Sequence, residues 1–267
     1  GEHDRAHGQP DDELRGLDGD RIEVVYCGLD HERFSLADPP PRDDPPLVVC
    51  WSRLRRYKST DVAIRAFQLI QEDFPDIEVL PVAADFLHPF DLPNPATMPR
   101  RNIVYFPGST IGNFEEQDAL ELLRVMHAEA GEDGALLIGV DLQKDPAVID
   151  AAYNDSAGVT AEFNLNMLRH LNREFGSNFD LGAFEHRATY RPDEGRVVVE
   201  LVSTREQEAR IGDARIDFRR DESIITEYSH KYTLDDFAAM ANQAGFSVDT
   251  VWTDARDWFS VQYCTRK

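Results

Sequence analysis

The sequence predicts an α/β fold with a mostly parallel sheet and an antiparallel C-terminal section. Three observations support this prediction. Short apolar strands alternate with amphipathic helical segments between residues 47 and 140, which is typical of βαβ units. The segment 135–140 is apolar throughout apart from Gly139, as expected for a strand buried on both faces. After residue 186, alternating polar and apolar residues replace the helical pattern and favour antiparallel strands.

The first part of the chain contains one predicted βαβ unit. Residues 1–46 predict a flexible N-terminus and a proline-rich linker, because they show little apolar periodicity and five prolines occupy 39–46; a short strand at 22–27 interrupts this stretch. The unit itself comprises a strand at 47–51, a helix with one apolar face, and a strand at 77–83; the face is formed by Ala63, Phe67, Ile70 and Phe74. Such a unit is too small to bury a core alone, so we expect it to share a sheet with later strands.

The remaining elements follow from the same patterns. Helices are predicted at 116–129, with Ala119, Leu122, Leu123 and Met126 inward, at 147–175 with a break at 155–158, and at 234–244. Gly245 is placed to end the last helix. Strands are predicted at 102–106, 135–140, 196–203, 209–218, 247–252 and 258–264.

Composition excludes several classes of function. The 267 residues carry a formal charge of −22, which opposes binding to nucleic acid or to anionic lipid. No run approaches about 18 apolar residues, so no membrane-spanning helix is predicted. Three cysteines without metal-ligand spacing, and a start without a signal pattern, favour a cytoplasmic protein without a metal site. We expect a monomer.

Two predicted strands end in residues suited to ligand binding. Asp85 and Phe86 follow the strand at 77–83, and a carboxylate there can accept a hydrogen bond from an adenine amino group. Gly108 and Asn113 follow the strand at 102–106, where glycine lets the backbone approach a ligand and the amide can both donate and accept. From the residues alone, Asp85 could equally cap a helix or turn, and 108–113 could be an ordinary turn.

Two further positions carry polar groups in informative contexts. Tyr153 lies in an apolar Ala-Ala-Tyr segment. Its hydroxyl could bind a ligand, or the residue could be a buried tyrosine whose hydroxyl is hydrogen-bonded within the protein. Glu227 and Ser229 flank Tyr228; on a strand they share one face, and together they can bind both nitrogens of an imidazole. A solvent-exposed strand face is the alternative. His230 and Lys231 are interpreted as structural or surface residues.

Six sequence segments resemble the histidine-specific Nα-methyltransferases of ergothioneine synthesis, and they occur in the order and near the spacing found in that family. They lie at 82–86, 106–114, 139–146, 152–166, 226–233 and 252–254. The resemblance implies a Rossmann-like methyltransferase sheet over 78–267, S-adenosylmethionine as cofactor, and the α-amino group of L-histidine as the methyl acceptor. Methyl transfer of this kind needs alignment of an unprotonated amine more than it needs catalytic side chains, so no catalytic residue is assigned.

The resemblance also implies roles for the candidate residues. Asp85 and Phe86 would contact the adenine of the cofactor. Gly108 and Asn113 would bind the substrate amino acid, and Tyr153 would hold its carboxylate. The imidazole would lie against Glu227, Tyr228 and Ser229.

The N-terminal part resembles a different enzyme. Residues 26–34 and 52–67 are similar to the nucleotide-sugar half of retaining glycosyltransferases, in which Arg53 and Lys58 would contact the donor diphosphate. We therefore expect a methyltransferase-like domain over 47–267 in which 47–77 is a glycosyltransferase-like graft. The alternatives to a methyltransferase are a glycosyltransferase fragment and a non-catalytic amino-acid-binding module.

The predicted first strand lacks the loop that normally follows it in nucleotide-binding units. No glycine occurs between Trp51 and Thr60, whereas a glycine-rich turn is the usual cradle for a nucleotide cofactor. We therefore expect methyl transfer to be weak or lost.

Overall fold

The computed structural model describes residues 101–267 and, as backbone only, the strand at 47–50. All of them belong to one compact unit of the chain. The predicted elements at 22–27, 63–74 and 77–83 lie outside the described residues, as do Arg53, Lys58, Asp85 and Phe86.

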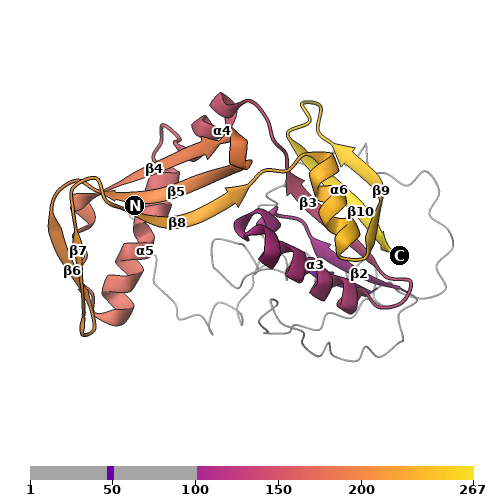
Figure 1. The fold of residues 1–267 in the computed structure, drawn as a ribbon, viewed down its shortest axis with the longest axis horizontal. Coiled ribbons are helices and arrows are strands. Elements are labelled where there is room, and N and C mark those ends of the chain that lie inside the picture. The colour runs from indigo at the N-terminus through magenta and orange to yellow at the C-terminus, as the bar shows by residue number, and fades with distance from the viewer. Residues whose placement is uncertain (1–46, 51–100) are drawn as a thin grey trace, which may run out of the picture. The chain divides into compact units, whose positions relative to one another are not determined.

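The main sheet has five strands in the order β1-β2-β3-β10-β9 (Figure 1). Strands β1 (Leu47–Cys50), β2 (Asn102–Phe106) and β3 (Ala135–Asp141) are parallel. Strand β10 (Phe259–Arg266) is antiparallel both to β3 and to β9 (Phe246–Thr253). This confirms the α/β class with an antiparallel C-terminal section, and it places the strand predicted at 47–51 in the same sheet as the later strands.

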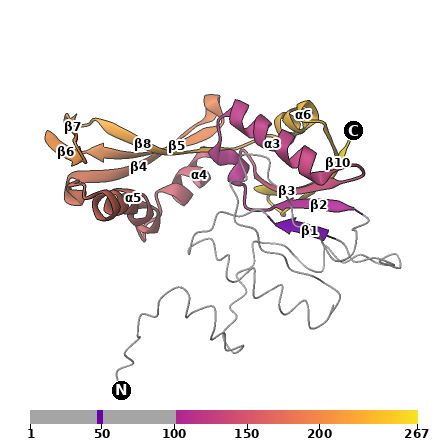
Figure 2. The same cartoon turned by 90° about the horizontal axis from the view of Figure 1, so that it is seen from below.

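Two helices cover one face of this sheet. Figure 2 shows α3 (Glu116–Ala130) and α6 (Leu234–Gln243) on the same side of the main sheet. The face of α3 that was predicted to be inward is buried, because its residues are at most 2% exposed; in α6, Phe237 and Ala241 are fully buried. Gly245 follows the C-cap of α6 with φ +97°, as a residue that ends a helix requires.

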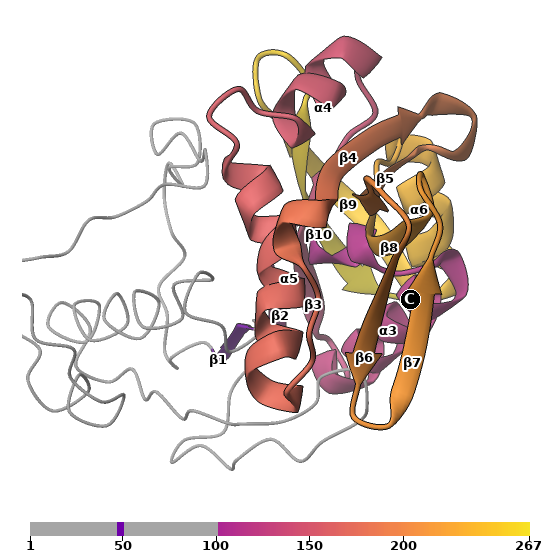
Figure 3. The same cartoon turned by 90° about the vertical axis from the view of Figure 1, so that its left-hand side faces the viewer.

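A second, antiparallel sheet is inserted between β3 and α6. It consists of β4 (Phe184–Arg191), β5 (Arg196–Ser203) and β8 (Ser223–His230), in that order. The helices α4 (Pro146–Tyr153) and α5 (Val159–Phe175) lie on one face of it, as Figures 2 and 3 show. A hairpin of β6 (Gln207–Ile211) and β7 (Ala214–Phe218) extends from its end. Within residues 101–267 the short 3-10 helices are η2 (Thr110–Asn113), η3 (Leu181–Ala183) and η4 (Pro192–Glu194).

The structure differs from the predicted strands in three places, and one of them is β8, of which only residues 227–229 were considered as part of a strand. The segment 209–218 is not one strand, because Gly212 has φ +56° and turns the chain between β6 and β7. Strand β4 was missed over most of its length, since charged residues alternate with its buried ones and hide the apolar face. The helical break predicted at 155–158 separates α4 from α5 as expected.

Among the described residues, no helix is long and apolar enough to cross a membrane. Cys264, on β10, is a free buried thiol, and burial raises its pKa to about 12.

Candidate functional site

The loop after β2 is fixed against the end of β3. The backbone of Pro107 passes so close to Gly139 that a Cβ there would lie 1.8 Å from the Pro107 carbonyl oxygen, which explains a glycine inside an otherwise apolar strand. Ser109, with φ +51°, accepts a hydrogen bond from the Asp141 amide through its hydroxyl oxygen at 2.9 Å. These contacts hold η2 at the carboxyl edge of the parallel strands, where open α/β sheets bind their ligands.

The same loop contains two predicted site residues. Gly108 is exposed, and Asn113, the last residue of η2, is half-buried. The neighbouring Gly112 contacts β8 directly, because its carbonyl oxygen lies 3.0 Å from Nδ1 of His230. Asn113 is therefore adjacent in sequence to the point where η2 meets the strand that carries Ser229.

Helix α4 positions Tyr153 as its last residue. Asp145 caps the start of the helix by accepting from the Ala147 amide at 2.8 Å, and Pro146 occupies its first position. At its end, the side-chain amide nitrogen Nδ2 of Asn154 donates to the Ala188 carbonyl at 2.9 Å, and the Tyr153 carbonyl lies 2.9 Å from Nε2 of His186. Both partners belong to β4, so the end of α4 is tied to the antiparallel sheet.

Three polar side chains meet at this point. The hydroxyl oxygen of Tyr153 lies 2.7 Å from that of Ser229, although the two residues are far apart in sequence. The ammonium group of Lys231 donates to both oxygens, at 2.8 Å each. We call Tyr153, Ser229 and Lys231 the hydroxyl–ammonium cluster. Ser229 is 6% exposed and Lys231 4% exposed, whereas Tyr153 is half-buried and is the member of the cluster nearest to solvent.

Asp141 provides the opposite charge. Its Oδ2 accepts from Lys231 at 2.7 Å, while its Oδ1 pairs with Lys144. Burial alone would lower the pKa of Lys231, but the neighbouring Tyr153 and Asp141 outweigh burial and raise that pKa above its usual value. Lys231 is therefore a buried cation, and its interpretation as a possible surface residue was wrong.

Strand β8 carries the remaining predicted residues. Glu227 pairs with Val199, and Ser229 with Val197, so both side chains lie on the same face of β8, as the alternation predicts. Both valines belong to an apolar cluster against which Tyr153 packs. Tyr228 lies on the other face, where the Arg196 guanidinium is 4.2 Å from its ring centre. The structure thus groups Tyr153 with Ser229, and places Glu227 along the same strand face.

Sequence reasoning missed Lys231 and Asp141. Lys231 could have been found by the strand alternation that groups Glu227 with Ser229. Every second residue of β8 and its continuation faces the same way, and Lys231 is two residues after Ser229. Asp141 is the last residue of a buried strand at the ligand-binding edge, the kind of position that was singled out for other residues. His230, in contrast, is structural as expected, through its contact with Gly112.

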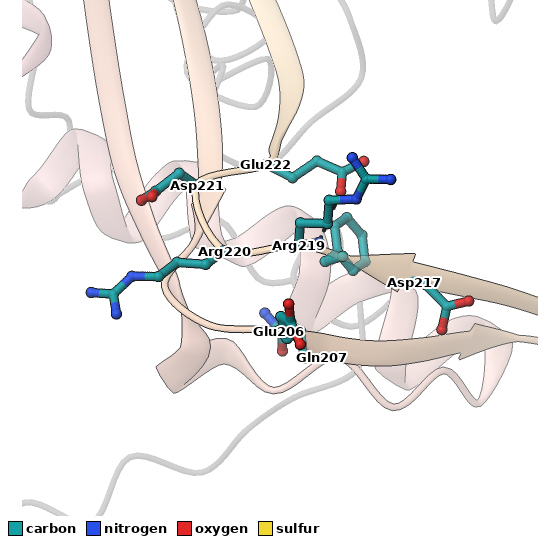
Figure 4. A pocket seen from close by; sticks show the side chains of 8 residues that line it. Glu206, Gln207, Asp217, Arg219, Arg220, Asp221 and Glu222 are labelled. Carbon is teal, nitrogen blue, oxygen red and sulfur yellow. Dashed lines mark hydrogen bonds between the residues drawn. The ribbon is translucent and has the colours of Figure 1, made fainter.

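The described residues contain no group of three His, Cys, Asp or Glu side chains that could hold a metal ion. A separate open depression lies between the start of β6 and the turn that joins β7 to β8 (Figure 4). It is lined by Glu206, Gln207, Asp217, Phe218, Arg219, Arg220, Asp221 and Glu222. None of these is a predicted site residue, and the depression mixes charges of both signs.

Comparison with known proteins gives a consistent result. The family described as "Histidine-specific methyltransferase, SAM-dependent" matches residues 55–266, and so begins inside the segment expected to be glycosyltransferase-like. The histidine N-alpha-methyltransferase of Mycolicibacterium smegmatis is 35% identical over 220 residues, which cover 80% of this chain and 67% of that protein. The protein of the same name from Mycobacterium tuberculosis is 32% identical with the same coverage.

More distant similarities extend to other methyltransferases. The L-tryptophan methyltransferase of Psilocybe serbica is 28% identical over 166 residues, covering 60% of this chain and 45% of that protein. Among solved structures, the CcbJ methyltransferase of Streptomyces caelestis is 12% identical, with a TM-score of 0.42 over 83% of this chain and 80% of that one.

Proposed function

We propose, from the premise that this chain belongs to the SAM-dependent, histidine-specific methyltransferase family, that it methylates the α-amino group of L-histidine and binds this substrate at the hydroxyl–ammonium cluster. The observation that carries the proposal is the meeting of Tyr153 and Ser229 at 2.7 Å beside the buried Lys231. An amino acid with a polar ring needs polar groups for its carboxylate and for its ring, held by a shielded frame.

The residues divide into three roles in this proposal. The Tyr153 hydroxyl donates a hydrogen bond to the substrate carboxylate. Glu227 and Ser229, on one face of β8, bind the two ring nitrogens, whereas the side chain of Tyr228 lies on the other face, against Arg196. Asn113 binds the substrate from η2, near Gly108. With the carboxylate and both ring nitrogens engaged, the α-amine is the remaining nucleophile.

S-adenosylmethionine supplies a methyl group on a sulfonium, which leaves as a neutral thioether. The described residues fit a nucleotide-containing cofactor in one respect: the carboxyl ends of β1, β2 and β3 lie along one edge, and the exposed Gly108 lies in the loop there. Asp85 and Phe86 would hold its adenine. The chain's own contribution is to align the amine and exclude water, since alignment alone can supply a large part of such a barrier.

The expected reaction is slow, because the sequence contains no glycine between Trp51 and Thr60, where a glycine-rich loop would be expected to cradle the cofactor. Transfer of labelled methyl from S-adenosylmethionine to L-histidine tests the proposal. We expect histidine-dependent incorporation that falls about tenfold in Asn113→Ala and in Tyr153→Phe, through the loss of one hydrogen bond to a charged group. Equal incorporation by both variants and by the unmodified chain would contradict the site assignment.

A further inference from the structure

Lys231 has no hydrogen bond left to give to a ligand. A protonated lysine carries three N–H donors, and here all three have acceptors: Asp141 at 2.7 Å, and Tyr153 and Ser229 at 2.8 Å. Since its side chain is also buried, any influence of Lys231 on a bound molecule must pass through the two hydroxyl groups.

Lys231 has an ionic partner apart from the two hydroxyls. Asp141 accepts from Lys231 through one oxygen, and its other oxygen pairs with Lys144. The raised pKa of Lys231 keeps it protonated at neutral pH. Lys144 therefore offers an internal comparison, because it shares the carboxylate but makes no contact with Tyr153 or Ser229 among the hydrogen bonds of the described residues.

The two hydroxyls have two protons between them. Because Lys231 donates to both oxygens, neither hydroxyl can point its proton toward Lys231. One proton lies between the oxygens, which are 2.7 Å apart, and the other points away from the cluster. The pair therefore offers a ligand one donor from one hydroxyl and one acceptor lone pair from the other, and the ligand decides which hydroxyl takes which role.

We infer that Lys231 is a positioning residue that makes Tyr153 the donor to the carboxylate of bound histidine and leaves Ser229 as the acceptor for one N–H of a protonated imidazole ring, whose other N–H donates to Glu227. This inference rests on the proposed function for the identity of the ligand. A carboxylate accepts but cannot donate, so its presence at Tyr153 draws the free proton there. Ser229 then donates to the Tyr153 oxygen, and its remaining lone pair faces the ring.

Without Lys231 this arrangement is lost. Both lone pairs of each hydroxyl oxygen would be open once the ammonium group is gone, so nothing would direct the free proton away from the cluster. The substrate carboxylate would then lose its donor, whereas a ligand without a carboxylate would lose little. The role of Lys231 thus predicts a change in ligand preference, which a purely structural role would not produce.

The test compares the affinities of L-histidine and L-histidinol, which differ by the carboxylate, in calorimetry with the unmodified chain, Lys231→Met and Lys144→Met. We expect the preference for histidine over histidinol to fall about tenfold in Lys231→Met, mainly through weaker histidine binding. In Lys144→Met the preference should stay within about threefold of its original value.

The outcomes separate the inference from the proposed function. If Lys231→Met keeps the original preference for histidine over histidinol, whether or not both ligands bind more weakly, the inference is wrong and the proposed function stands. If the unmodified chain binds no histidine at millimolar concentration, the proposed function is wrong and the inference falls with it.

If circular dichroism shows that Lys231→Met does not fold, two milder variants decide. Tyr153→Phe removes the donor to the carboxylate and should abolish the preference for histidine. Ser229→Ala leaves Tyr153 and Lys231 in contact, so it should weaken both ligands and retain the preference. The opposite pattern would overturn the inference.

Discussion

Gly112 and His230 bring the two sheets of the described unit together. The Gly112 carbonyl oxygen lies 3.0 Å from Nδ1 of His230, and a Cβ on Gly112 would lie only 2.6 Å from the His230 carbonyl oxygen. The 3-10 helix at the edge of the main sheet thus packs backbone to backbone against the strand that carries Glu227 and Ser229. Together with the ion pair of Asp141 and Lys231 and the hydrogen bond from the Tyr232 amide to the Asp141 carbonyl, this contact sets how candidate residues of the two sheets lie relative to one another.

Gly112→Ala should therefore destabilise the protein and disturb the site together. The added methyl group would collide with backbone atoms that cannot rotate away, so β8 must move from η2. We expect a loss of about 1–3 kcal/mol in the free energy of unfolding, measured in urea. As a control, Gly108→Ala should be nearly neutral in stability, because its Cβ would meet only Thr110 Oγ1, at 3.7 Å. Equal stability of the two variants would contradict this packing.

Asp155 should make stability depend on acid pH. Its carboxylate accepts from the amides of Val159 and Thr160, at the start of α5, and hydrogen bonds with Thr160 and Val159 lower its pKa from 3.8 to about 2. Because the pKa of Asp155 is lower in the folded protein, its stabilisation is fully present above pH 3.8 and is lost as the pH falls through about 2. Asp155→Ala should lower the thermal midpoint at neutral pH, and the difference should shrink across this window in thermal melts. A difference that stays constant would exclude this role.

Glu227→Ala should weaken histidine binding. The loss of a carboxylate that accepts from an imidazole N–H costs roughly 1.5–3 kcal/mol, or about tenfold or more in affinity. Calorimetry measures this, with Glu185→Ala as the control, since Glu185 is an exposed carboxylate on β4. If both variants bind histidine like the unmodified chain, Glu227 does not contact the ring.

Histidine recognition should be less impaired than cofactor binding. The cluster around Tyr153 is fully formed, whereas the segment between Trp51 and Thr60 has no glycine to cradle a nucleotide. Calorimetry is carried out with histidine and with S-adenosylhomocysteine, each alone and then together. We expect histidine to bind when S-adenosylhomocysteine is absent. Tight binding of S-adenosylhomocysteine alone would show that the missing glycine turn is dispensable.

Much of the fold could be predicted because the spacing of apolar residues along the sequence indicates which face of a helix or strand is buried. The helix α3 and the strands β3 and β5 match their predicted bounds closely, since each buries one clear apolar face or run. Strand β4 was harder to predict because several of its outward residues are charged and no two of its buried residues are adjacent in sequence. The β6–β7 hairpin depends on one turn at Gly212, which alternation alone does not locate.

The site was predictable where its residues follow a local rule. Glu227 and Ser229 share a strand face because they are two apart, and this rule also reaches Lys231, whose charge suggested a surface position. What the sequence could not provide is the partner that makes a buried lysine tolerable. That partner, Asp141, lies ninety residues away and reaches Lys231 only because two sheets meet.

The most direct test of the account is the position of the transferred methyl group. S-adenosylmethionine labelled with ¹³C in its methyl group is incubated with the chain and L-histidine, and the product is examined by ¹H–¹³C NMR. The account predicts a labelled methyl on the α-nitrogen, because the ring nitrogens and the carboxylate are held by Glu227, Ser229 and Tyr153. A labelled methyl on a ring nitrogen, or no labelled histidine after prolonged incubation, would contradict it.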